Sequence, residues 1–234
     1  MSTVNFVETI SVDMPNRKPV PKVDAEDARM MLAASCHLGS QNVTSEMERY
    51  VWQKRGDGVH IINIEKTWKK IQLAAKIIAS IDNPEDICVL ASRPYAQKAA
   101  HKFASFLGAQ AVVGRFTPGT FTNYITSTFR EPRLVVVADS HADQRAILEA
   151  SYGNIPCISL CDIDADLRGI DCAIPANNRG KHAIGTVFYL LVREVLRLRQ
   201  AISRTAPWDI MVDLFFYRDP EDIAEDEGGL PAQE

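Results

Sequence analysis

The chain has 234 residues, and its 46% hydrophobic and 24% charged residues are typical of a globular protein rather than of a disordered chain. No run reaches the roughly 18 uncharged apolar residues that a membrane-spanning helix needs, and the first residues lack a basic region followed by an apolar core, so we expect neither a membrane span nor a secretory signal. The formal net charge of −4 is uneven, because residues 209–234 carry nine acids and one base whereas residues 1–208 carry 25 bases and 21 acids; such a body permits a polyanionic partner without demanding one.

Short β-rich runs alternate with helical segments along most of the chain. We predict a flexible arm over 1–23, a helix over 24–37, a strand over 59–64, a helix over 67–80 capped by Thr67, a strand over 87–91, a helix over 97–107, strands over 111–114 and 134–138, a helix over 143–152, strands over 157–161 and 171–174, and a long helix over 181–199. The strands are continuous apolar runs, which is typical of a parallel sheet covered on both faces. We therefore predict a doubly wound α/β domain over 24–208 and a segment over 209–234 whose acidic end is disordered.

Motifs for nucleotide and metal binding are missing. The turn after the first predicted strand has no glycine, which excludes the dinucleotide fingerprint, and Gly180-Lys181 lacks both the preceding glycine and the following Ser or Thr of a phosphate-binding loop. Cys157 and Cys161 alternate with apolar residues in a predicted strand, so we interpret them as core residues rather than metal ligands. With no export signal, the five cysteines indicate reduced, buried thiols in a cytosolic protein. We predict no cofactor and no metal.

An enzyme remains the alternative hypothesis. Asp139 and His141 follow a predicted strand, at the edge of the sheet where proteins of this architecture bind ligands. No nucleophile elbow accompanies them, so we favour turn and surface hydrogen bonds over a hydrolase site, and we predict no catalytic residue. A hydrolase would need a closed pocket at this position. Asp162, Asp164 and Asp166 lack the rest of a calcium loop, and we interpret them as a polar loop.

Cations and hydroxyl groups gather at the predicted strand ends. Arginine guanidinium groups, threonine hydroxyls and free loop amides can all donate hydrogen bonds to a phosphodiester backbone. No catalytic general base or nucleophile lies among them. An ordinary solvated loop fits the composition equally well. The candidate RNA-binding residues are Arg93, Lys98, Lys102, Arg115, Thr117, Gly119, Thr120, Asn123, Arg130 and Arg133.

Two further clusters lie near the end of the chain. Arg193 and Arg197 share one face of the last predicted helix, opposite an apolar stripe, and we interpret this face as solvated. An aromatic run follows the helix; it can pack on the body, which is favoured for most of it, or present a patch to a partner. The candidate protein-contact residues are Trp208, Phe215, Phe216, Tyr217 and Arg218.

Several motifs resemble one protein family. The ten-residue run GRFTPGTFTN at 114–123 is the most specific, and matching stretches lie at 33–39, 61–63, 66–68, 129–134, 173–175, 177–178, 193–197 and 216–220. With these motifs the chain resembles the eukaryotic small-subunit ribosomal protein SA family, also called laminin receptor precursors, which are relatives of the bacterial S-two ribosomal proteins. The similarity runs over residues 24–222, which is nearly all of the predicted globular part.

The resemblance implies a flavodoxin-like fold, a doubly wound and mostly parallel five-stranded sheet with helices on both faces. It also implies a non-enzymatic constituent of the small (40S) ribosomal subunit that contacts rRNA and neighbouring ribosomal proteins and supports subunit assembly and rRNA maturation. No membrane or small-molecule substrate is expected, and the expected location is the cytoplasmic ribosome, with nuclear passage during assembly. Animal members carry acidic repeats that this chain lacks, and residues 174–199 lack their aromatic-rich centre, so we assign no adhesion role.

Overall fold

The computed structural model describes residues 23–204, 206 and 208–219. The predicted arm and the predicted disordered end therefore lie almost entirely outside the described residues. The elements, in chain order, are α1 (Ala25–Ala33), η1 (Glu48–Tyr50), β1 (Val51–Lys54), β2 (His60–Ile62), α2 (Ile64–Ala79), η2 (Pro84–Asp86), β3 (Ile87–Ala91), α3 (Pro94–Leu107), β4 (Gln110–Val113), β5 (Leu134–Val137), α4 (Gln144–Tyr152), β6 (Cys157–Cys161), β7 (Cys172–Pro175), α5 (Lys181–Leu198) and η3 (Val212–Phe215). Within the described part, none of the helices combines the length and apolarity that crossing a bilayer requires.

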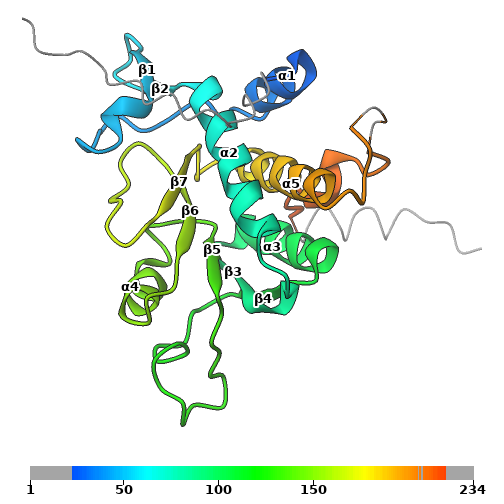
Figure 1. Cartoon of the computed structure of the whole chain (residues 1–234). Coiled ribbons are helices and arrows are strands. Elements are labelled where there is room, and N and C mark those ends of the chain that lie inside the picture. Colours follow the sequence, from blue (N-terminus) through cyan, green and yellow to red (C-terminus); the bar gives the residue numbers. More distant parts are fainter. Residues whose placement is uncertain (1–22, 205, 207, 220–234) are drawn as a thin grey trace, which may run out of the picture.

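A five-stranded sheet forms the centre of the molecule, in the order β4-β3-β5-β6-β7 with every neighbouring pair parallel. Helices α2, α3 and α5 lie on one side of it and α4 lies on the other (Figure 1). Successive strand residues point to opposite faces, so Val89 and Val136 join the core under the three helices while Leu90 and Val137 pack toward α4. Both faces are therefore buried, as the continuous apolar runs indicate. The sheet and its helices confirm the predicted fold class.

A separate two-stranded antiparallel sheet, formed by β1 and β2, lies beside the start of α2 (Figure 1). The run predicted as a strand over 59–64 thus belongs to a hairpin and not to the main sheet. Strand β1 was not predicted, because its sequence VWQK is too short and too polar to stand out from a loop.

The N-terminus of α2 is capped by Asn63, whose Oδ1 accepts hydrogen bonds from the backbone N–H groups of Glu65 (3.0 Å) and Lys66 (3.4 Å). The prediction that Thr67 caps this helix is wrong. Thr67 is buried inside the first turns, and its hydroxyl donates to the Pro175 carbonyl at the end of β7 (2.7 Å). The contact fixes the beginning of α2 against the sheet.

All five cysteines are free and buried, as predicted. Burial raises the pKa of Cys36, Cys157 and Cys161 to about 12 in each case, so these thiols stay protonated at neutral pH.

The interpretation of Arg193 and Arg197 as a solvated helix face is wrong. Arg193 is buried, and its guanidinium donates two hydrogen bonds to the Asp27 carboxylate on α1 (2.9 and 2.6 Å). Arg197 donates to Glu194 (2.7 Å), which is itself buried on α5. This network joins α1 to α5. The helical pattern of α5 could not reveal it, because the partner Asp27 lies far away in the sequence.

Replacing Asp27 by alanine should destabilise the protein by about 3–5 kcal/mol, because it leaves the Arg193 guanidinium buried without its partner. The free energy of unfolding in urea measures the loss. Glu26→Ala, next to it on the exposed side of α1, should change the unfolding midpoint little. If the two variants unfolded at the same urea concentration, the buried pair would not hold α1 in place.

Candidate nucleic-acid interface

The connection between β4 and β5, residues 114–133, contains neither a helix nor a strand. Because β4 and β5 are parallel and lie on either side of β3, this connection must cross a face of the sheet, where such folds normally place a helix. In place of that helix, Phe116 and Phe121 cover this face of the sheet with apolar side chains. Their rings pack together with centroids 5.3 Å apart, and both are buried in the core that α4 shares with the sheet. The loop is therefore anchored at its base.

Glu149, on α4, fixes the turn at the base of this loop. Its carboxylate accepts hydrogen bonds from the backbone N–H groups of Gly119 (2.7 Å) and Phe121 (3.5 Å). Gly119 has a φ of 88°, in the left-handed region that a side chain disfavours. The Thr120 hydroxyl is buried and donates to the Thr117 carbonyl (2.6 Å). Glu149 is not among the predicted site residues, because a lone glutamate on a helix carries no such signal.

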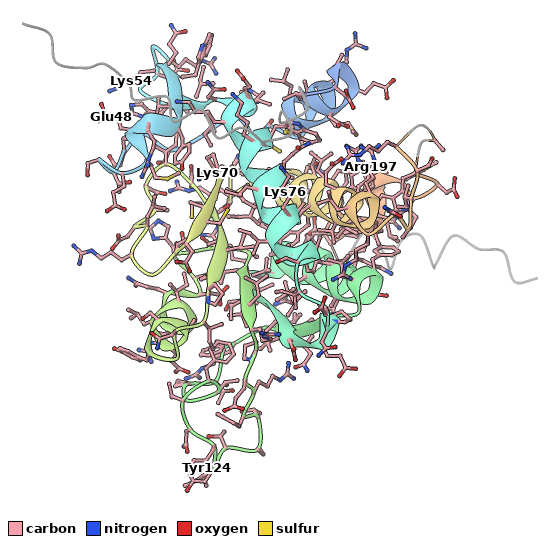
Figure 2. The ribbon with its side chains drawn as sticks, viewed as in Figure 1. Glu48, Lys54, Lys70, Lys76, Tyr124 and Arg197 are labelled. Carbon is pink, nitrogen blue, oxygen red and sulfur yellow. The ribbon has the colours of Figure 1, made fainter. Side chains whose placement is uncertain are left out.

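The far end of the loop is exposed. Tyr124 and Ile125 are 79% and 76% exposed, and Figure 2 shows Tyr124 at the tip, well away from the body of the protein. Thr117 and Asn123 are exposed nearby. Tyr124 was missing from the candidate residues, although an aromatic residue within a polar, threonine-rich run was a signal that could have found it.

A groove of about 560 Å³ lies where the loop leaves β4 and α4 begins. Arg115, His141 and Arg145 line it, together with Ser92 and Asp143, whose side chains are hydrogen-bonded to each other. Burial raises the pKa of Asp143. Neither Arg115 nor Arg145 has an ion-pair partner within the part of the chain that the structure describes. The groove therefore presents two uncompensated arginines.

Three of the candidate RNA-binding residues point inward. Thr120 is buried within its turn, so the prediction of an RNA contact is wrong for it. Arg93 is paired with the buried carboxylate of Asp139 and donates to the Asn178 carbonyl (3.2 Å). Arg130 places its guanidinium beside the Cys88 thiol on the sheet. The structure therefore gives Arg93 and Arg130 internal roles.

Lys98 and Lys102 lie one turn apart on α3, behind the sheet from the loop, where they meet Arg218. Burial first, and then the charges of Arg218 and Lys102, lower the pKa of Lys98. The Tyr95 and Tyr217 rings contact each other beside them, with centroids 5.2 Å apart. The predicted basic cluster is thus two surfaces: this α3 surface, formed by Lys98, Lys102 and Arg218, and the 114–133 loop with exposed Arg133 at its end.

The aromatic run near the C-terminus packs mostly on the body. Phe215 is fully buried against Phe106 and Tyr189, so the prediction of a partner contact is wrong for this residue. Trp208 stacks on Tyr189, with centroids 5.1 Å apart, and is half-buried. Phe216 contacts His182 (4.8 Å between centroids) and is also half-buried. Partner contacts by Trp208, Phe216, Tyr217 and exposed Arg218 remain a prediction.

The position of a hydrolase site is lined by ion pairs. The hollow there measures about 280 Å³, and Arg93, Asp139, Asp162, Asn178 and Arg179 line it. Asp139 is buried and already neutralised by Arg93, so it cannot orient a catalytic histidine. The His141 ring is half-exposed and lies 3.3 Å from Asp164, not against Asp139. Among the residues the structure describes, no group of three or more His, Cys, Asp or Glu side chains could hold a metal ion. The closed pocket that the enzyme hypothesis needs does not form.

Comparisons with known proteins agree on one family. The family model described as "Ribosomal protein S2" matches residues 31–130 and 124–197. Small ribosomal subunit protein uS2B of Schizosaccharomyces japonicus is 63% identical over 202 residues, which cover 86% of this chain and 71% of that protein. Small ribosomal subunit protein uS2 of Fusarium vanettenii is 58% identical over 212 residues, covering 90% of this chain and 72% of the relative. These matches confirm the resemblance that the motifs indicated.

Replacing Glu149 by alanine should release the loop without unfolding the sheet, because the N–H groups of Gly119 and Phe121 lose their acceptor. Hydrogen exchange should become faster in residues 117–126 and stay unchanged in β3 and β5. Leu148→Ala, at an exposed position next to it on α4, is the matched control. Equal exchange in both variants would show that Glu149 does not order the loop.

Replacing Gly185 by alanine should displace the C-terminal segment from α5. A Cβ atom there would lie 2.6 Å from Cδ1 of Phe216 and 3.1 Å from the Phe215 carbonyl oxygen. Gly56→Ala is the matched control, since its Cβ would meet nothing within 4 Å. Limited proteolysis should cut residues 212–219 faster in the first variant only; unchanged protection would contradict the packing described above.

Proposed function

The chain belongs to the ribosomal protein S2 family, and from this premise we propose that it is a structural constituent of the small ribosomal subunit that contacts ribosomal RNA through the 114–133 loop. Proteins of this family are structural and have no enzymatic activity. The observation that supports the loop as the contact is its construction: a rigid base formed by Phe116, Phe121 and Glu149, and an exposed end with Tyr124. Such a loop presents donors and an aromatic ring to solvent from an anchored base.

The chemistry of the loop suits RNA. Arg115 offers a planar fork of N–H donors to a phosphate, while the exposed Thr117 and Asn123 side chains can bond to phosphates, sugars or base edges. Tyr124 can stack on an unpaired base. Because neutralised phosphates release counterions, this contact should weaken as the salt concentration rises.

The α3 surface supports contacts with a neighbouring ribosomal protein or with RNA. Three cations lie close enough to disfavour one another, so a negatively charged partner would relieve their repulsion. The half-buried Tyr217 beside them adds an apolar element to this surface. We further propose that the chain supports subunit assembly and rRNA maturation, passing through the nucleus before it works in cytoplasmic ribosomes.

Reversing the charge of Arg115, as Arg115→Glu, should reduce incorporation of the chain into small subunits while leaving its stability unchanged, because Arg115 is exposed and makes no ion pair with a described residue. Sucrose-gradient fractions, probed for the tagged chain in cells that also carry the untagged one, measure incorporation. Arg168→Glu is the control for a charge reversal at an exposed site elsewhere.

Normal incorporation of a folded Arg115→Glu chain would contradict the loop as the RNA contact. Recovery of the unaltered chain only in soluble fractions, with none in sedimenting small subunits, would contradict the ribosomal function itself.

A further inference from the structure

The β1–β2 hairpin is held rigidly against α2. Tyr50, which precedes β1, is buried, and its ring receives the Arg49 guanidinium at 5.5 Å and the Lys70 ammonium group at 5.9 Å from its centroid. Lys66, on α2, donates to the Arg49 carbonyl, and the Asn63 N–H donates to the Tyr50 carbonyl (2.9 Å). These contacts join the hairpin and the helix into one preformed surface.

This hairpin–helix surface is positively charged. Residues 46–76 carry seven Lys and Arg against four Asp and Glu. Asp57 and Glu65 are already paired, with Arg55 (3.1 Å) and Lys69 (2.6 Å). Five cations have no carboxylate within ion-pairing distance among residues 23–204, 206 and 208–219: Arg49, Lys54, Lys66, Lys70 and Lys76. The remaining acids, Glu46 and Glu48, leave an excess of positive charge.

These cations lie on the hairpin and on the solvent-facing half of α2. Lys66 and Lys70 are four residues apart and share one row of α2, whereas Lys76 lies about 120° round the helix from Lys70; Figure 2 shows Lys54 on the hairpin with Lys70 and Lys76 further along the helix. At about 1.5 Å per residue, Lys66 and Lys76 are about 15 Å apart along the helix axis. A positively charged surface of this length can meet several phosphates of one strand.

Trp52, two residues before Lys54 in β1, faces solvent. Val51 pairs with Ile62 and Gln53 pairs with Ile61, so Trp52 is the extra residue of a β-bulge. Bulges redirect a side chain at edges of sheets, and here the Trp52 ring is 66% exposed. A large aromatic ring turned outward beside unpaired cations is the arrangement on which unpaired bases stack.

We propose that the hairpin–helix surface is a second RNA-binding site, which takes a single-stranded or bulged RNA segment with its phosphates along Lys54, Lys66, Lys70 and Lys76 and an unpaired base on Trp52. Duplex RNA fits less well, since its bases are stacked inside the helix and offer no free ring to Trp52. The inference rests on the proposed ribosomal function but concerns a surface distinct from the 114–133 loop, which lies at the other end of the molecule (Figure 1).

The test uses the full chain and a mixed-sequence single-stranded RNA of about 12 nucleotides, with a duplex of the same length for comparison. Trp52→Ala should weaken binding of the single strand about tenfold, whereas Trp52→Phe keeps a ring for stacking and should stay within about threefold of the original. Tyr152→Ala, which removes another exposed ring at the end of α4, should have no effect. RNA should quench tryptophan fluorescence in the original chain and not in Trp52→Phe.

The cations are tested by the salt dependence of the same binding. Lys54→Glu combined with Lys76→Glu should lower the slope of log K against log salt by about 1.4, because two phosphate contacts are lost. Arg168→Glu should leave the slope unchanged. Failure of the original chain to bind the single strand, or equal binding by Trp52→Ala, would overturn the proposal.

The two functional proposals fail in distinguishable ways. Incorporation into small subunits, measured on gradients, tests the ribosomal function without reference to Trp52. Normal incorporation of the original chain combined with unaltered RNA binding by Trp52→Ala would overturn only the second site. Loss of incorporation by Trp52→Ala with RNA binding intact would assign the hairpin–helix surface to a protein partner and also overturn its assignment to RNA.

Discussion

The buried carboxylate of Asp139 is the point on which the edge of the sheet depends. It follows β5, pairs with Arg93 after β3, and accepts hydrogen bonds from the Asn178 side chain after β7 (3.3 Å) and from the His141 N–H (3.2 Å). Asn178 in turn donates to the Leu160 carbonyl in β6 (2.8 Å). A carboxylate buried without a counter-ion is strongly unfavourable, so Arg93 must stay in this place. One charge pair therefore gathers the ends of four strands.

This arrangement limits the space for a ligand at the carboxyl-end edge of the sheet. An open α/β sheet ordinarily binds its ligand beyond the carboxyl ends of the strands; here the chain's own ion pairs line one part of that edge, and the Arg115 groove lies beside them. Functional groups are instead carried outward, on the 114–133 loop and on the hairpin beside α2. The loop replaces the crossover helix that usually connects two parallel strands, and the hairpin is an addition before α2. A scaffold of this kind suits a structural component better than an enzyme.

The fold class could be predicted from the sequence because each buried strand is a continuous apolar run, and the helices show their apolar stripes. The site was predicted less well, since polar residue types alone do not reveal their partners. Arg93 was expected on RNA and Asp139 in a possible enzyme, yet the two neutralise each other. Thr120 bonds within its own turn, to the Thr117 carbonyl, and Phe215 belongs to a core formed by distant segments. Trp52 escaped notice because its exposure results from a bulge, which depends on the register with β2.

The positive charge of residues 1–208 is divided between internal and external positions. Several basic residues, among them Arg93, Arg193 and Arg197, form ion pairs with buried carboxylates. These arginines therefore add little to the positive potential at the surface. The uncompensated cations are concentrated on the groove beside the loop, the α3 surface and the hairpin–helix surface. The loop and the hairpin lie at opposite ends of the molecule (Figure 1), so the two proposed RNA contacts would engage two separate RNA segments. A low net charge would limit nonspecific binding, while the local surfaces keep enough positive charge for the RNA contacts proposed above.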